Sequence, residues 1–179
     1  MIAYKGFEKG LVCLGYQFFM GLNVTEKANC RANGFHCAEN PLDCLTYYRN
    51  MDESEYYLVN AGGDIDEDGS DSKIACTELT ILKKLSRKEF FLHVLAYMVD
   101  HPTLQHTASE RATARNGYAV VCGIDPVAKG KVGDILAFAA EDPYSGKIVQ
   151  IAAACVDDKK YHTDVWYGVD LKERKEGKF

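Results

Sequence analysis

Apolar and polar positions alternate at strand spacing along most of the chain and recur at helical spacing in two segments. The strand-like segments, bounded by glycines or polar turns, are 2–7, 11–14, 16–20, 35–38, 55–59, 73–82, 134–140, 147–156 and 162–170. The helical segments are 41–49 and 87–100. The pattern therefore predicts an α+β fold, a mostly antiparallel sheet with two helices, followed by a small all-β region.

The first helix has a clear start signal. Asn40 is a good N-cap, Pro41 suits the first helical position, and Asp43 places a carboxylate near the positive end of the helix. The predicted strand 35–38 ends just before it, so His36 should lie near the helix start. We expect this strand-to-helix corner to offer backbone N–H groups to an anionic ligand.

The second helix has the strongest signals in the chain. Ser86 and Glu89 form a capping box, Leu85 and Phe90 stand at the positions of a hydrophobic staple, and Pro102 ends the helix. A broad apolar stripe should cover one face of a sheet, and it consists of Phe91, Leu92, Leu95, Met98 and Val99.

The composition changes from Thr107 onward to small residues and regularly placed glycines. We place a domain boundary near Gln105, which gives an α+β domain at 1–104 and a small β domain at 105–179. Short apolar pieces up to Gly133, each closed by a glycine, resemble rungs of a β-solenoid, but three repeats are normally needed, so only a stub is predicted. A three-strand antiparallel meander should follow, and the open end of the stub would invite self-association or capping.

Composition and charge restrict the classes of partner. The chain has 179 residues, 47% of them hydrophobic and 26% charged, which is typical of a globular protein. A net charge of -5 argues against nucleic-acid or anionic-membrane binding, because those partners require a concentrated basic surface. The sequence contains neither an apolar run long enough to cross a membrane nor the order of a secretion signal, so we predict a cytoplasmic protein.

The seven cysteines are predicted to be reduced thiols, since their number is odd and none form a C-x-x-C pair. Cys30, Cys37 and Cys44 recur at a regular interval beside His36, which leaves a zinc site as an alternative. Zinc ligands usually come in close pairs, however, so small buried hydrophobic residues are favoured and no metal site is predicted.

An acidic loop at 64–72 invites comparison with a calcium loop. Asp64, Asp66 and Asp68 stand at ligand positions of an EF-hand, and Gly69 follows at the glycine position. The pattern fails at Ala75, where a bidentate Glu is required. A solvated hairpin turn is therefore favoured, with weak calcium binding as the alternative.

The whole chain resembles an uncharacterised family found in bacteria, phages and prophages. The motifs that carry this resemblance are Tyr4-Lys5-Gly6-Phe7, the run from Gly34 to Asp43 with Tyr47-Tyr48, and Ser72 to Thr77. The resemblance implies no assigned activity.

The first half also resembles, more distantly, the ADP-ribosyltransferase superfold. There an early strand ends in His-Gly or Arg-Gly, and a later strand reads Gly-x-Tyr-x-Ala before a second Tyr that closes a short helix. The matching positions here are Lys5-Gly6 for the first motif, and Gly34, His36, Ala38 and Tyr47 for the second. The resemblance implies NAD as the cofactor, bound by Lys5, Gly6, His36 and Tyr47, and Glu78 as the catalytic residue on a late strand.

Two departures from that pattern keep other interpretations open. His36 replaces the first stacking Tyr, and Lys5 replaces the residue that bonds ribose, although a lysine could meet a phosphate. Three functions are compatible with the sequence: transfer of ADP-ribose from NAD to a host macromolecule, binding of a nucleotide or peptide without turnover, and interaction with a host protein or a second copy through the C-terminal β region. In a fourth interpretation His36 and Tyr47 merely pack the corner.

Overall fold

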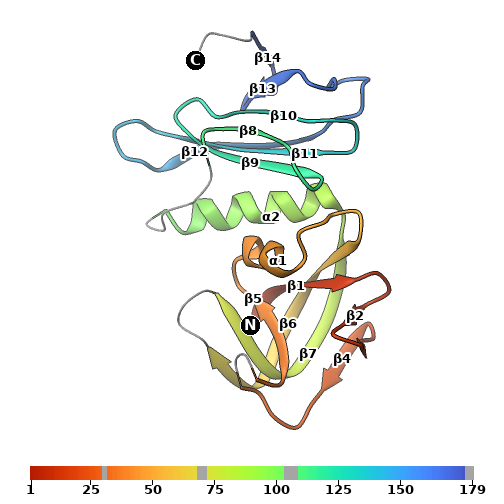
Figure 1. Cartoon of the computed structure of the whole chain (residues 1–179). Helices are drawn as coiled ribbons and strands as arrows, with labels where there is room; N and C mark the ends of the chain where they lie inside the picture. The colour runs from red at the N-terminus through yellow and green to blue at the C-terminus, as the bar shows by residue number, and fades with distance from the viewer. Residues whose placement is uncertain (30–31, 68–71, 103–108, 176–179) are drawn as a thin grey trace. The chain divides into compact units, whose positions relative to one another are not determined.

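The computed structural model describes residues 1–29, 32–67, 72–102 and 109–175, and it divides into two compact units, Met1–Ser86 and Arg87–Phe179 (Figure 1). Each unit has its own strands and core. The boundary that the composition predicts, near Gln105, falls among residues outside this description and stays a prediction.

The first unit is a small antiparallel barrel with one short helix. Its elements are β1 (Ile2–Glu8), β2 (Val12–Cys13), β3 (Tyr16–Gln17), β4 (Gly21–Val24), β5 (Phe35–Ala38), α1 (Pro41–Tyr47), β6 (Ser54–Glu67) and β7 (Lys73–Leu85). Strand β1 pairs with β5 and β6, and β7 also pairs with both, so these four strands close on themselves. The short strands β2 and β3 extend β1, and β4 pairs with β7.

The barrel interior follows from the alternation of side chains along its strands. Ala3 and Phe7 of β1 are fully buried, so alternation places Tyr4 and Gly6 on the outer face. Inside, the Phe7 ring meets other aromatic rings edge to face, with a centroid distance of 5.2 Å to Phe18. The outer face of β1 is thereby left available to α1.

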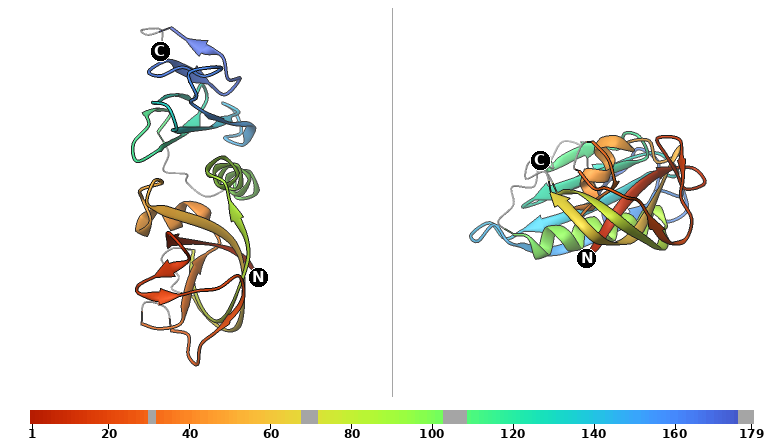
Figure 2. Two further views of the ribbon diagram at one scale, coloured as in Figure 1. Left: turned by 90° about the vertical axis from the view of Figure 1, so that its right-hand side faces the viewer. Right: turned by 90° about the horizontal axis from the view of Figure 1, so that it is seen from below.

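The hairpin formed by β6 and β7 is longer than the sequence predicts (Figure 2). The pattern predicts a strand at 55–59 and an acidic loop at 64–72, but β6 continues to Glu67. A register shift between Gly62 and Ile65 inserts one extra residue into β6, and Gly63 has a positive φ of 68°. The glycines therefore form a bulge within β6, and the strand continues past them.

The second unit stacks one helix and two sheets. Its elements are α2 (Arg87–Asp100), β8 (Arg111–Thr113), β9 (Tyr118–Gly123), β10 (Val127–Lys129), β11 (Ile135–Glu141), β12 (Ile148–Cys155), β13 (Trp166–Gly168) and β14 (Glu173–Arg174). The sheets have the strand orders β14-β13-β10-β8 and β12-β11-β9. Helix α2 packs on β11 and β12, and one core cluster draws residues from both sheets. Strand β11 is buried along nearly its whole length because it is covered on both faces.

The bounds predicted for α2 are confirmed, and three of the five residues in its predicted apolar stripe are buried. Phe91, Leu95 and Met98 are buried, whereas Leu92 and Val99 are each 39% exposed. The α+β class with a mostly antiparallel arrangement is confirmed as well.

The three-strand meander predicted for the C-terminal region is wrong in its third strand. Strands β11 and β12 pair antiparallel, but β13 pairs with β10 and β14 in the other sheet. The turn before it is the reason. The Asp157 carboxylate accepts backbone N–H groups of Lys159, Lys160 and Tyr161, and Asp164 adopts a φ of 59°, so the chain turns away from β12.

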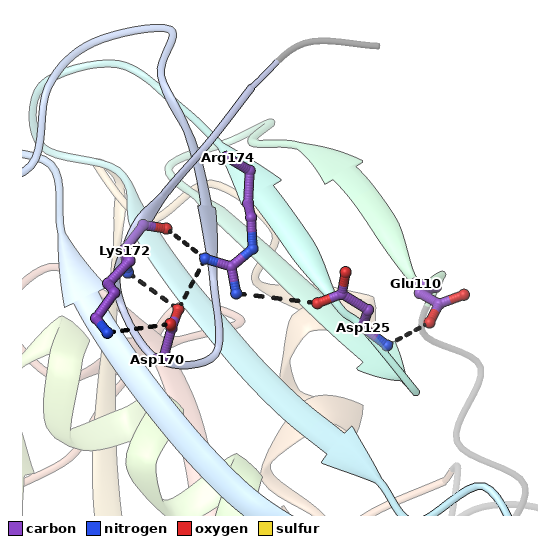
Figure 3. A network of polar contacts seen from close by, with 5 residues as sticks. All are labelled: Glu110, Asp125, Asp170, Lys172 and Arg174. Atoms are coloured by element: carbon purple, nitrogen blue, oxygen red, sulfur yellow. Dashed lines mark hydrogen bonds and ion pairs between the residues drawn. The ribbon is translucent and has the colours of Figure 1, made fainter. Parts of the chain in front are cut away.

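A polar network ties the C-terminal strand to the rest of the second unit (Figure 3). Arg174 on β14 lies 3.0 Å from Asp170 and 3.9 Å from Asp125. The Asp125 backbone N–H donates to the Glu110 carboxylate at 2.6 Å, which links the residues before β10 to those before β8. None of the helices in the described ranges is long and apolar enough to cross a membrane.

Candidate functional site

A pocket of about 420 Å³ lies in the first unit and is lined mainly by residues of β1, β5 and α1. It is lined by Tyr4, Lys5, Gly6, Glu8, Cys13, Leu14, His36, Cys37, Ala38, Asp43, Cys44, Tyr47, Tyr48 and Lys73. All four residues predicted to bind a cofactor are among them. The pocket therefore forms at the strand-to-helix corner that the sequence singled out.

The start of α1 is fixed by the predicted cap and by Ser72, the residue that precedes β7. The Asn40 side chain accepts the Leu42 N–H at 3.1 Å, as predicted for the N-cap. The Ser72 hydroxyl donates to the Asp43 carboxylate at 2.6 Å and accepts the Asn40 N–H at 2.8 Å. These bonds place Lys73, the residue that opens β7, beside the helix.

Gly6 makes room for a tyrosine ring of the chain itself. A Cβ atom at Gly6 would lie 2.5 Å from Cδ2 of Tyr48 and 2.8 Å from its Cγ. The Tyr48 hydroxyl donates to the Cys13 sulfur at 3.0 Å, and burial, followed by this bond, raises the pKa of the phenol. The space above Gly6, where the distant resemblance implies a nicotinamide, is thus filled by Tyr48.

Lys5 extends into the barrel instead of toward solvent. Its side chain is 4% exposed, and its Nζ donates to the His36 carbonyl at 2.7 Å and to the Cys13 sulfur at 3.6 Å. The ammonium also lies 5.0 Å from the Phe7 ring centroid and 5.4 Å from that of Phe18. Strands β1 and β5 pair at one position only, so Lys5 bridges them where their ladder ends. Among the described residues, no carboxylate forms an ion pair with it.

The rim of the pocket combines a neutral imidazole with an exposed phenol ring. Burial lowers the pKa of His36, and the positive charges of Lys5 and Lys73 lower it further, so the ring is neutral near pH 7. Tyr47 is 62% exposed, and its hydroxyl accepts the Lys73 ammonium at 3.2 Å. Burial also raises the pKa of Tyr4. At neutral pH the rim therefore presents uncharged rings and one accessible cation.

The predicted catalytic residue lies elsewhere on the sheet. Glu78 is exposed on β7, in register with Val24 on one side and Gly62 on the other, and it does not line the pocket. The carboxylates that do line it are Glu8, which is exposed, and Asp43, which is bonded to Ser72. The structure thus brings the predicted binding residues together but leaves Glu78 apart from them.

Some lining residues were not predicted. Tyr4 shares the outer face of β1 with Gly6, and strict alternation along that strand could have identified it. Tyr48 follows Tyr47 in the sequence, but its place over Gly6 depends on how the helix ends. Lys73 belongs to the motif from Ser72 to Thr77, but only the pairing of β5 with β7 brings it to the pocket.

The described residues contain no group of three or more His, Cys, Asp or Glu side chains that could hold a metal ion. Cys37 and Cys44 are buried, and burial raises the pKa of the Cys44 thiol to about 12, so this thiol stays protonated. Cys30 lies outside the description, as do Asp68, Gly69 and Asp71 of the acidic loop. Asp64 and Asp66 belong to β6.

A family model described as a domain of unknown function, DUF7666, matches residues 1–93. The chain belongs to the DUF7666 family. Every residue that lines the pocket falls within residues 1–93, so the pocket lies in the part of the chain that the family model matches. The family description carries no activity and no link to phages or to ADP-ribosyltransferases. No curated protein and no solved structure matches the chain.

Proposed function

We propose that the pocket binds a small ligand with a planar ring, with NAD as the first ligand to test, and that the chain binds it without transferring ADP-ribose. The observation that carries this proposal is the convergence of His36, Tyr47 and Lys73 on one rim from three separate elements. Rings of this kind stack on planar ligands, and a lysine beside them suits a phosphate.

The size of the pocket agrees with a modest ligand. A volume of about 420 Å³ lies in the lower part of the range of small-molecule sites, which is roughly 300 to 1,000 Å³. Such a pocket suits one ring with its substituents, and the rest of a dinucleotide would extend past Tyr47 toward solvent. The ring would lie beside Tyr48, because Tyr48 already covers Gly6.

Binding is favoured over transfer because the pocket lacks a suitably placed carboxylate. A transferase needs a glutamate that touches the ribose and stabilises developing positive charge. Glu78 does not line the pocket, and Asp43 is engaged by the Ser72 hydroxyl and N–H. Glu8 is the remaining carboxylate, and its exposure leaves it well solvated.

The test is a thermal-shift and calorimetric titration with NAD and with nicotinamide. A ligand that binds only the folded state stabilises it by mass action and so raises the melting temperature. At a ligand concentration one hundred times Kd, the unfolding free energy increases by about 2.7 kcal/mol. We expect a shift in the wild type that is lost in His36→Ala and in Tyr47→Ala. It should survive in Glu78→Gln and in Tyr144→Ala, which changes a 97% exposed tyrosine of the second unit.

Two results would contradict the proposal. No shift at millimolar ligand, with all variants folded, would eliminate NAD and nicotinamide as ligands. Loss of binding in Glu78→Gln would instead support the transferase hypothesis and justify an assay for ADP-ribose transfer.

A second candidate function concerns the second unit. We infer that it contains a short β-solenoid that acts as an oligomerisation or docking module. The supporting observation is that β8 with β10, and β9 with β11, pair parallel and in register, as successive rungs do. Thr113→Lys places a charge on the exposed edge strand β8, and it should lower any concentration-dependent mass that arises through this unit.

A further inference from the structure

The segment 11–24 combines an absence of charge with unusual exposure. It contains no Asp, Glu, Lys, Arg or His, in a chain that is 26% charged. Its large exposed apolar side chains are Leu14, Tyr16, Phe19, Met20, Leu22 and Val24. A cluster of exposed apolar side chains within one short segment is typical of an interaction surface.

Strand β4 lies at the end of this segment and at the edge of the sheet. It pairs antiparallel with β7, and within the described ranges no strand pairs with its other side (Figure 1). Natural edge strands are usually protected by charges, prolines or bulges. The sequence Gly21-Leu22-Asn23-Val24 offers none of these.

The ladder to β7 determines which backbone groups of β4 face outward. The Thr25 N–H donates to the Thr77 carbonyl at 2.9 Å, so Thr25 and every second residue before it direct their backbone groups toward β7. The N–H and C=O groups of Leu22 and Val24 therefore point to the open side. Their side chains share one face and are 61% and 60% exposed.

Asn23 holds this edge in place before any partner binds. Its side chain is 5% exposed, accepts the Phe19 N–H at 3.1 Å and donates to the Phe19 carbonyl at 2.8 Å. It also donates to the Leu79 carbonyl of β7 at 3.3 Å. These bonds fix the turn before β4 and anchor the strand, so little conformational entropy is lost on pairing.

We propose that β4 is the interface of a two-fold symmetric dimer, in which it pairs antiparallel with β4 of a second copy. A two-fold axis at Asn23 places Leu22 opposite Val24 of the other copy. Each of these two pairs then exchanges both of its backbone hydrogen bonds, and the leucine and valine side chains meet on one face. The edge is self-complementary, as an isologous interface requires, and that argues for a second copy over an unrelated protein.

Charge does not oppose this pairing. On that face, the carboxylate in register with Val24 is Glu78. In the dimer, Glu78 and its equivalent are separated by three strand spacings, about 14 Å, which exceeds the screening length at physiological salt. The edge is short, so we expect a weak dimer whose population depends on protein concentration.

The test is sedimentation velocity over a wide range of protein concentration. The average mass of the wild type should rise from 19.9 kDa toward twice that value. Val24→Lys and Leu22→Lys should each stay monomeric, because each places a charge against its pairing partner. Val149→Lys is the matched control, since Val149 is 68% exposed on β12, an edge strand of the second unit. It should dimerise like the wild type.

Several outcomes would overturn the inference. One is a wild type that stays monomeric at the highest concentration, and another is a dimer that persists in both β4 variants. A dimer that is abolished only by Val149→Lys or Thr113→Lys would place the interface in the second unit. Binding to neutral phospholipid vesicles without dimerisation would likewise replace the second copy by a membrane surface. Melting temperatures of all variants show whether a loss of dimer reflects a loss of folding.

Discussion

Gly6→Ala separates two explanations for the presence of a glycine at position 6, beside the pocket. If Gly6 is required for packing, the added Cβ clashes with Tyr48 whether or not a ligand is present. If Gly6 is required for ligand approach, the free protein should tolerate alanine. The backbone of Gly6 does not have a positive φ, so the contact with Tyr48 is the main steric cost.

The magnitude follows from the distances. The new Cβ would lie 2.5 to 3.0 Å from Cδ2, Cγ and Cβ of Tyr48, at the base of the ring where a small rotation cannot relieve the overlap. Overpacking of this kind costs about 2 kcal/mol. For a unit of this size, that corresponds to a fall in melting temperature of roughly 8 to 16 °C.

A double-mutant cycle isolates the clash. Urea unfolding is measured for the wild type, Gly6→Ala, Tyr48→Ala and the double variant. Without the Tyr48 ring, Gly6→Ala should be neutral or stabilising by about 0.5 kcal/mol, because alanine loses less conformational entropy in a strand. The coupling free energy should therefore be about 2 to 2.5 kcal/mol.

Two results would refute this reasoning. One is an equal cost of Gly6→Ala in the presence and absence of Tyr48. The other is a Gly6→Ala variant as stable as the wild type, which would leave ligand approach as the explanation for glycine.

Two further predictions concern the same corner. Burial and then the charges of Lys5 and Lys73 lower the pKa of His36 in the folded protein. The unfolded chain therefore takes up a proton on His36 at a higher pH than the folded chain does, so the free energy of unfolding should fall as the pH drops below about 6.5. His36→Gln should reduce the difference in urea unfolding between about pH 7.5 and about pH 5.5, and an unchanged difference would contradict this. Asn40→Ala should cost about 1 kcal/mol in urea unfolding, because the Leu42 N–H loses its acceptor, whereas Asn40→Asp, which keeps an acceptor, should stay close to the wild type. Equal losses in both variants would assign the effect to something other than the cap.

Some elements of the candidate site could be predicted because their signals are local. The cap at Asn40 and the strand 35–38 needed only adjacent residues, and both are confirmed. The predicted helix nevertheless ends earlier than expected, at Tyr47, and this end lets Tyr48 turn over Gly6. The function of the site stays a proposal.

The placement of Lys5 did not follow from its short motif. The distant resemblance implies that Lys5 binds NAD, where a lysine could meet a phosphate. Alternation along β1 places it on the same face as Ala3 and Phe7, which is the barrel interior. Its ammonium is accommodated there by the His36 carbonyl and two aromatic rings, partners that come from distant parts of the chain.

By itself, the sequence determined the fold class, the bounds of α2, the start of α1 and the corner that holds the pocket. These depend on side-chain periodicity, capping and turn chemistry within a few residues. Only the tertiary structure decided that Glu78 lies apart from the pocket, that Lys73 joins it, that β13 leaves the expected meander and that β4 forms an open edge. These features depend on which strands pair and in which register, and that choice is made by burial over the whole unit.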